Sequence, residues 1–273
     1  MEKKIPKNNI LRWIGSKTHS LEVLERIIKQ ISERNLIELY CGSSVISINL
    51  AKKFDIVTAV DIDENIINFF NYLKENSQNI LEFYKEYHDK LKNDTKHYYE
   101  VRTEFNKTKD PRFWFALNRT SIGGLMRYNN GNLNMSIHLG RFGTKPKTIS
   151  KIFDNNIESI RKINFIHRDA LEYVDNNFIQ NSLIVLDPPY YNTNGMYITN
   201  TQNENKLIEI IEKLKNNKII LFYGSQVDDR REIMNKYFCK IIEIGNEKNP
   251  GSFLRKIKSN DNTKIKEKVF LNF

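Results

Sequence analysis

The sequence lacks several features that define common protein classes. Its 273 residues hold two cysteines, Cys41 and Cys239, with no metal-ligand spacing and too few for a disulfide framework, which suits a reducing cytosol. No apolar run approaches the length of a membrane span, and the polar N-terminus has no apolar signal-peptide core. Internal repeats and low-complexity tracts are also missing. We therefore expect a cytoplasmic protein with no membrane contact and no metal.

The charge balance is the first positive signal. Lysine and arginine outnumber acidic residues by 43 to 33, giving a formal net charge of +10. Such an excess indicates a polyanionic partner, although frequent Lys, Asn and Ile also point to a compositional bias of the genome. The length suits one large domain, or one domain with an insertion, and a hydrophobic content of 40% is ample for a core.

A short apolar run, Leu183 to Leu186, ends abruptly at Asp187 and two prolines. The run is typical of a buried, parallel strand, and prolines cannot continue a central strand. In open α/β sheets, ligands bind at the carboxyl ends of strands. The sequence therefore fixes an acid, a rigid turn and the aromatic ring of Tyr190 at such a place.

This set of groups suits methyl transfer to the amino group of a flat base. The lone pair of an exocyclic amine is spread into the ring, and two acceptors on its hydrogens would localise it. Asp187 supplies one acceptor and the carbonyl of Pro188 the second. Pro189 stiffens the turn, and Tyr190 can stack on a base swung out of its helix. The alternative is an ordinary strand followed by a proline turn.

The Asp187-Pro188-Pro189-Tyr190 stretch is similar to the catalytic motif of amino-methyltransferases, and the chain resembles the Dam-like family of DNA N6-adenine methyltransferases. The resemblance implies a Rossmann-like α/β sheet with an inserted, mostly helical target-recognition domain. It also implies S-adenosyl-L-methionine as cofactor, double-stranded DNA as partner and a flipped adenine as target. The four residues of the motif are then the catalytic set.

A second pattern indicates the cofactor site. Leu36 to Tyr40 predicts the first strand, followed by a loop of small residues, 41–44, and a helix from Val45. Asp61 ends the next predicted strand, 23 residues after Glu38, where an acid accepts the ribose hydroxyls. Asp63 is the neighbouring candidate, and capping of the helix from Glu64 is the alternative role.

The resemblance adds three further cofactor contacts. It implies that Trp13 packs on the cofactor, that Lys17 meets its carboxylate and that Asp169 lies at its adenine amino group. Ser16 stands where the family has a second glycine. The predicted cofactor-binding residues are Trp13, Lys17, Glu38, Tyr40, Gly42, Asp61, Asp169 and Asp187.

Residues 118–134 are rich in glycine, asparagine and arginine, and Asn130-Gly131 predicts a hairpin. Such a hairpin suits DNA, because arginine pairs with guanine and asparagine with adenine; a polar surface hairpin is the alternative. The family has a similar stretch, but Ile122 and Gly123 depart from it, which leaves the target sequence open. The predicted DNA-binding residues are Arg119, Arg127, Tyr128, Asn129 and Asn134, with Arg141, Lys145 and Lys147 on phosphates.

The predicted catalytic domain is discontinuous, comprising residues 1–66 and 152–273, and the recognition insert is 67–151. Helices are expected at 20–32, 68–104, 113–118 and 204–214. Further strands are expected at 56–60, 163–167 and 218–223. Segments 237–245 and 268–272 should form a closing antiparallel hairpin. The polar loop with Gly195-Met196-Tyr197 is expected over the target base, and segment 246–263 facing DNA.

Other functions fit parts of the pattern. The target could be N4 of cytosine or an RNA base, although aspartate at position 187 favours adenine by resemblance. A catalytically dead DNA-binding module of the same fold is the alternative from another class. A restriction endonuclease acting on the same site is a further expected partner, within a restriction-modification system.

Overall fold

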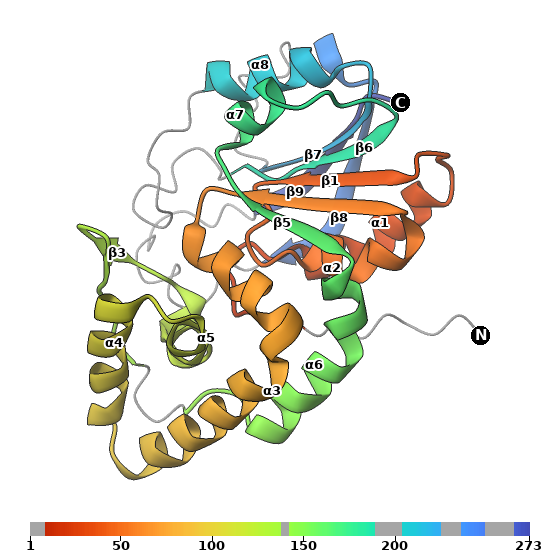
Figure 1. Ribbon diagram of the computed structural model, residues 1–273. Helices are drawn as coiled ribbons and strands as arrows, with labels where there is room; N and C mark the ends of the chain where they lie inside the picture. The colour runs from red at the N-terminus through yellow and green to blue at the C-terminus, as the bar shows by residue number, and fades with distance from the viewer. Residues whose placement is uncertain (1–8, 138–141, 189–203, 225–235, 249–264) are drawn as a thin grey trace.

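The computed structural model describes residues 9–137, 142–188, 204–224, 236–248 and 265–273, and its centre is a seven-stranded sheet (Figure 1). The strand order is β5-β2-β1-β6-β7-β9-β8. The strands are β1 (Asn35–Leu39), β2 (Ile56–Asp61), β5 (Ile163–His167), β6 (Ser182–Leu186), β7 (Lys218–Gly224), β8 (Lys240–Lys248) and β9 (Ile265–Leu271).

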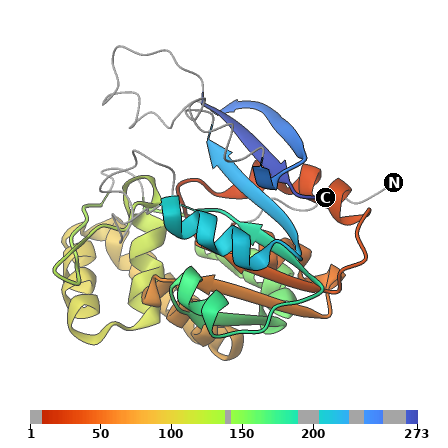
Figure 2. The ribbon, with the colours of Figure 1, turned by 90° about the horizontal axis from the view of Figure 1, so that it is seen from above.

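Five of these strands run parallel, and two close the sheet in the opposite direction. Strands β5, β2, β1, β6 and β7 pair in parallel, whereas β9 lies antiparallel to both β7 and β8. The predicted Rossmann-like class and the predicted closing hairpin are therefore confirmed. Figure 2 shows β8 and β9 at one end of the sheet, away from the helical insert.

Helices cover both faces of the sheet, because successive strand residues point to opposite sides. In β1, Leu36 packs into one core and Ile37 and Leu39 into the other. One face carries η1 (Lys17–Ser20), α1 (Leu21–Ile28), α2 (Val45–Leu50), η2 (Ala51–Lys53), α3 (Glu64–Asn93) and α6 (Pro146–Arg161). The other face carries α7 (Ala170–Asp175) and α8 (Glu204–Leu214).

The insert is mostly helical, as predicted, but its first part is two helices rather than one. Helix α3 spans 30 residues with a break in helical geometry at Asn76, and it ends at Asn93. Asp94 is extended and accepts a hydrogen bond from the Lys96 amide at 2.8 Å, which ends one helix and starts the next. The insert continues with α4 (Lys96–Thr108), α5 (Pro111–Thr120), η3 (Ile122–Gly124), β3 (Tyr128–Asn129) and β4 (Asn132–Leu133).

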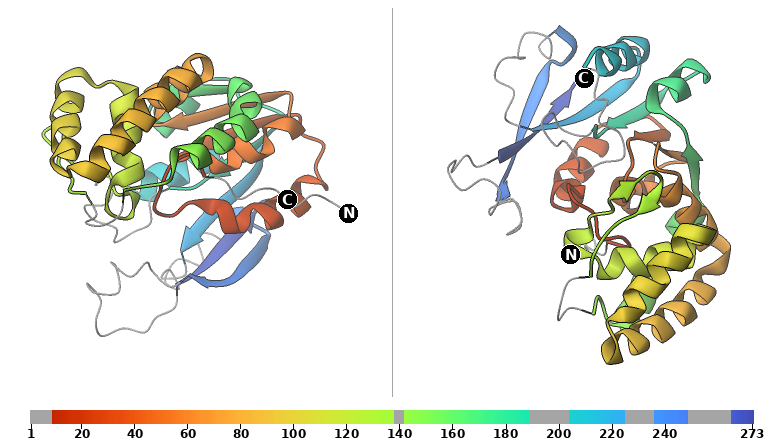
Figure 3. Two further views of the ribbon diagram at one scale, coloured as in Figure 1. Left: turned by 90° about the horizontal axis from the view of Figure 1, so that it is seen from below. Right: turned by 90° about the vertical axis from the view of Figure 1, so that its left-hand side faces the viewer.

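Packing of the insert is continuous with packing under the sheet. The ring of Phe69 in α3 stacks on Phe115 of α5 at 5.1 Å, and the neighbouring Phe70 stacks on Phe165 of β5 at 4.7 Å. The predicted boundary near 67 lies inside α3, and the one near 151 lies inside α6. Helix α6 was not among the helices that the sequence predicts. These two helices pack together and carry the insert to one side of the sheet (Figure 3).

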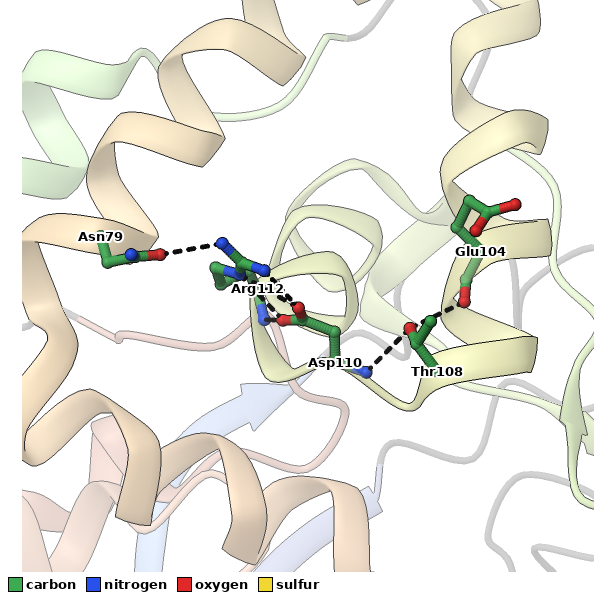
Figure 4. Close-up of polar contacts among 5 residues, drawn as sticks. All are labelled: Asn79, Glu104, Thr108, Asp110 and Arg112. Atoms are coloured by element: carbon green, nitrogen blue, oxygen red, sulfur yellow. Dashed lines mark hydrogen bonds and ion pairs between the residues drawn. The ribbon is translucent and has the colours of Figure 1, made fainter.

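A polar cluster fixes the start of α5 (Figure 4). Asp110 precedes Pro111, accepts a hydrogen bond from the Arg112 amide at 2.8 Å and caps the helix. The same carboxylate pairs with the Arg112 guanidinium at 2.6 Å, and that guanidinium donates to Asn79 of α3 at 3.1 Å. The cluster therefore fastens α5 to α3, and the chain continues from α5 through η3 to the predicted DNA-reading hairpin.

That hairpin forms as the sequence predicts. Strands β3 and β4 pair antiparallel, and Asn130 and Gly131 both have positive φ, 49° and 74°, as the two-residue turn requires. Helix α4 is bonded to the second strand of the hairpin. The Asn106 side chain accepts a hydrogen bond from the Leu133 amide at 2.7 Å and donates one to the Leu133 carbonyl at 3.1 Å. Among the described helices, none is long and apolar enough to cross a membrane.

Candidate active site

The predicted site residues lie where three parallel strands end together. The register pairs Leu39 of β1 with Val60 of β2 and with Leu186 of β6, so the residues that follow each strand share one edge. The amide of Cys41 donates to the Val60 carbonyl at 3.0 Å, and the amide of Asp187 to the Leu39 carbonyl at 3.4 Å. The sheet thus brings the loop after β1, Asp61 and Asp187 into one place.

The loop after β1 is a tight turn that is packed closely against the Trp13 indole. Tyr40, Gly42 and Ser44 all adopt positive φ, and the Ser44 amide closes the turn on the Cys41 carbonyl at 2.7 Å. A Cβ atom at position 42 would lie 2.6 Å from Nε1 of Trp13. Only glycine allows the indole of Trp13 to pack here, so the structure places this predicted cofactor contact against the predicted cofactor loop.

The structure separates the roles of Asp61 and Asp63. The Asp61 carboxylate accepts from the Gly42 amide at 2.7 Å and from the Asp63 amide at 2.9 Å, so it faces the loop. Asp63 is buried and caps α3, accepting from the Asn65 amide at 3.0 Å. Because a carboxylate has about four acceptor positions, Asp61 keeps capacity for a ligand hydroxyl. The capping role belongs to Asp63.

Several buried acids share this edge of the sheet. Burial raises the pKa of Glu38 to about 8, with Asp187 and Asp61 adding repulsion, although the Ser47 amide donates to it at 2.9 Å. Burial, with repulsion from Asp61, raises the pKa of Asp63 to about 7. The pKa of Asp61 is also raised by burial. A cation bound here would lower these pKa values and favour the charged form of the acids.

Lys17 forms an ion pair with Asp187 inside this edge. Its Nζ lies 2.6 Å from Oδ1 of Asp187, donates to the Gly15 carbonyl at 2.9 Å and sits 5.4 Å from the Phe222 ring centroid. The Lys17 side chain is 4% exposed and that of Asp187 is 20% exposed, so the acid is the member of the pair that solvent reaches. The predicted contact of Lys17 with a cofactor carboxylate stays a prediction.

Asp169 lies across the site, at the end of β5. Its Oδ1 caps α7 by accepting from the Leu171 amide at 3.0 Å, and its Oδ2 pairs with Nζ of Lys206 of α8 at 2.6 Å. Burial raises the pKa of the Tyr40 hydroxyl, and the charges of Asp169 and Asp61 raise it further. Tyr40 therefore lies within electrostatic reach of both acids. A ligand amine at Asp169 would share this carboxylate with Lys206.

The predicted DNA-binding residues divide into exposed and buried groups. Arg127, Asn129 and Asn134 of the hairpin are exposed, as are Lys145 and Lys147 at the start of α6. Pro188 is buried beside Asp187. The predicted residues Pro189, Tyr190 and Arg141, with the loop around Gly195-Met196-Tyr197 and the segment from 249 to 263, lie outside the described residues.

Two predicted DNA contacts are placed differently from the expectation. Arg119 is 5% exposed, and its guanidinium donates to the carbonyls of Asn9 and Ile10 and to the Thr144 hydroxyl. With its donors turned inward, Arg119 is a structural residue, and its assignment to DNA is corrected. Tyr128 is half-buried, and its hydroxyl accepts a hydrogen bond from Trp114 at 2.9 Å, so its hydroxyl anchors the hairpin to α5.

Sequence reasoning missed three polar residues that organise the site. Asn118 pairs with the backbone of Arg12, Asn106 pairs with the backbone of Leu133, and Lys206 pairs with Asp169. Asn118 and Asn106 join segments 106 and 27 positions apart along the chain. No local pattern in the sequence shows such pairs, although a buried asparagine within an apolar helix was a signal that something must satisfy its amide.

The fold and the site together define an α/β protein of the methyltransferase type. Over residues 13–249 the chain matches the family of D12 class N6 adenine-specific DNA methyltransferases, and it belongs to that family. It is 25% identical over 197 residues to a DNA adenine methylase of Haemophilus influenzae, with 70% of this chain and 66% of the relative covered.

Two other relatives are DNA adenine methylases as well. A DNA adenine methylase of Vibrio cholerae is 28% identical over 187 residues, covering 66% of this chain and 64% of the relative. One of Salmonella typhi is 26% identical over 228 residues, covering 77% of both. The chain thus spans roughly two thirds to three quarters of the length of these curated relatives.

The raised pKa of Glu38 predicts how stability depends on pH. An acid whose pKa rises from 4.5 to about 8 on folding contributes stability that is complete below the unfolded value and is lost as pH rises through 8. Glu38→Gln, which keeps an acceptor for Ser47, should therefore match the wild type near pH 4. Near pH 9 it should be more stable by several kcal/mol, with about 5 kcal/mol as the upper limit, since the pKa rises from 4.5 to about 8 and one pKa unit corresponds to about 1.4 kcal/mol.

Urea unfolding of both proteins without ligand at the two pH values measures this difference. Glu64→Gln, at an exposed acid of the same region, is the matched control and should show no pH-dependent gain. Equal stability of Glu38→Gln and wild type at high pH would show that Glu38 folds as an ordinary charged carboxylate.

Proposed function

We propose that the chain transfers a methyl group from S-adenosyl-L-methionine to N6 of adenine in double-stranded DNA. One observation supports this most strongly. Asp187, the first residue of the predicted catalytic motif, stands at the end of β6 beside the loop at Gly42 and the acid at Asp61. A methyl acceptor site and a nucleotide-type cofactor site are therefore adjacent, in a chain that belongs to an adenine-specific family.

The residues present fit this cofactor. Asp61 has acceptor capacity for ribose hydroxyls, and Gly42 leaves space that a side chain would fill, next to the Trp13 indole. A ligand that carries positive charge on sulfur and on its amino group would favour the charged form of the buried acids around Glu38, which burial otherwise disfavours. When bound, the cofactor supplies an electrophilic methyl group.

Asp187 and Pro188 are the groups that we assign to the target amine. The Asp187 carboxylate and the Pro188 carbonyl accept its two hydrogens and localise its lone pair. The ammonium of Lys17 lies 2.6 Å from Oδ1 and holds the Asp187 carboxylate in place at the end of β6. The pair is buried on the lysine side and more exposed on the aspartate side, so Asp187 is the member of the pair that an incoming base can approach.

We assign the reading of DNA to the hairpin of β3 and β4. This hairpin is part of the proposed recognition insert, residues 67–151. Its exposed residues Arg127, Asn129 and Asn134 suit base edges, since arginine and asparagine make the bidentate contacts that distinguish guanine and adenine. Lys145 and Lys147 stand exposed at the N-terminus of α6, a position that favours phosphate oxygens. We assign Arg141 to phosphates as well.

We further propose a cytoplasmic location, which is where bacteria such as those of the relatives keep their DNA. A restriction endonuclease for the same site is the partner whose cleavage such methylation would block. Cleavage of unmethylated but not of methylated DNA, by a nuclease purified from the same cells, tests that pairing separately from the reaction itself.

The first prediction concerns Asp187. Asp187→Ala removes one of the two acceptors on the amine, and loss of one preorganised group of this kind costs about a hundred- to thousand-fold in turnover. Labelled methyl transfer to DNA measures it. Asp55→Ala is the control, because Asp55 also pairs with a cation, Arg34 at 2.7 Å, but at the exposed opposite end of the sheet. Near-normal turnover of a folded Asp187→Ala enzyme would rule out this mechanism.

The second prediction separates base reading from phosphate contact. Arg127→Ala should relax discrimination at one base pair by about 1 to 3 kcal/mol, with little change in the salt dependence of binding. Lys145→Ala should weaken binding to every DNA alike and lower the slope of log affinity against log salt by about one. These effects differ because only a base contact carries sequence information.

Two measurements cover these effects: methylation of duplexes altered at each position around the mapped target adenine, and binding at several salt concentrations. Lys147→Ala, in the first turn of the helix that Lys145 precedes, should behave as Lys145→Ala does, since both residues are assigned to phosphates. If Arg127→Ala lowers activity equally on all duplexes and also flattens the salt slope, Arg127 is a phosphate contact.

A further inference from the structure

The segment that carries Trp13 and Lys17 is attached to the DNA-reading insert. Immediately before Trp13, the Arg12 amide donates to Oδ1 of Asn118 at 2.9 Å, and Nδ2 of Asn118 donates back to the Arg12 carbonyl at 2.9 Å. The asparagine side chain thus pairs with residue 12 as a neighbouring strand would. Asn118 belongs to α5 and is fully buried.

Three further contacts surround this pair. The Arg12 guanidinium donates to the Ser121 carbonyl at 3.1 Å, and the buried Arg119 donates to the Ile10 carbonyl at 3.1 Å. Gly124, with φ of 75°, packs so closely that a Cβ atom there would lie 2.5 Å from the Arg12 carbonyl oxygen. The insert therefore grips residues 10–12 from the end of α5 and from the entry to the hairpin.

We propose that Asn118 is a positioning residue for the cofactor: it fixes Arg12, and through Arg12 it sets the place of Trp13 over Gly42 and of Lys17 at Asp187. This inference rests on the proposed function, since it takes Trp13 as a cofactor contact. Trp13 is the next residue after the clamped one, so a shift of the Arg12 backbone moves the indole directly. The insert then serves the cofactor site as well as DNA.

A second asparagine provides a control with the same chemistry. Asn106 of α4 pairs with the amide and carbonyl of Leu133 at 2.7 and 3.1 Å, as Asn118 pairs with Arg12. One amide holds the segment before Trp13, and the other holds the hairpin strand that follows the turn. Loss of the first should therefore affect the cofactor, and loss of the second should affect DNA discrimination.

The experiment compares Asn118→Leu, Asn118→Ser and Asn106→Leu in the full chain. Binding of S-adenosylhomocysteine without DNA is measured by calorimetry, and KM for cofactor and kcat are measured with saturating DNA. Asn118→Leu should weaken binding and raise the cofactor KM about tenfold, as the loss of two buried hydrogen bonds allows, with kcat changed by less than about threefold. Asn106→Leu should leave cofactor affinity unchanged and reduce discrimination among altered duplexes.

Thermal unfolding shows which variants fold, and Asn118→Ser supplies the smaller change if the leucine variant does not. Wild-type affinity in either folded Asn118 variant overturns the inference. Equal weakening by Asn106→Leu also overturns it, because general loosening of the insert would then explain the effect. Trp13→Ala separates the two levels: if it too retains wild-type affinity, the proposed cofactor role of this segment fails, and otherwise only the positioning role of Asn118 does.

Discussion

The burial of several carboxylates at one sheet edge is the constraint on which the rest of the site depends. Neighbouring parallel strands end at the same edge, so the fold brings Glu38, Asp61 and Asp187 together despite the repulsion between their carboxylates. Burial without compensation is costly, and it shows as raised pKa values in Glu38 and Asp61. Lys17 offsets part of this cost by pairing with Asp187, the acid that we assign to the methyl acceptor. A cationic cofactor would offset more, which links stability of the site to its ligand.

The position of the proposed active site at this sheet edge gives a reason for the many contacts that attach the insert to the rest of the protein. If the hairpin reads DNA and Asp187 receives the target base, as proposed, the position of the hairpin relative to the sheet must be fixed. Aromatic stacking of Phe69 on Phe115 and the paired amides of Asn118 and Asn106 provide that rigidity without a separate domain interface. The hairpin and the proposed active site therefore rest on one continuous core, from β5 through α3 to α5.

The sequence predicted those features that depend on local pattern. The strand ending at Asp187, the turn at Asn130-Gly131 and the closing antiparallel pair follow from apolar runs and turn chemistry, and the structure confirms them. What it could not predict depends on contacts between distant segments. Arg119 is typical of a DNA contact in its local sequence, yet its donors are used by carbonyls more than a hundred positions away. The pairing of Lys17 with Asp187 is equally invisible to spacing, because only the folded sheet brings the two together.

The identity of the methylated atom tests the central claim most directly. Purified protein would be incubated with S-adenosyl-L-methionine and unmethylated double-stranded DNA, and the DNA then digested to nucleosides for mass spectrometry. Asp187 beside the cofactor loop, in a chain of this family, predicts that N6-methyladenine accumulates and that unmodified adenine falls correspondingly. Accumulation of N4-methylcytosine, or methylation of RNA with none of DNA, would contradict the account.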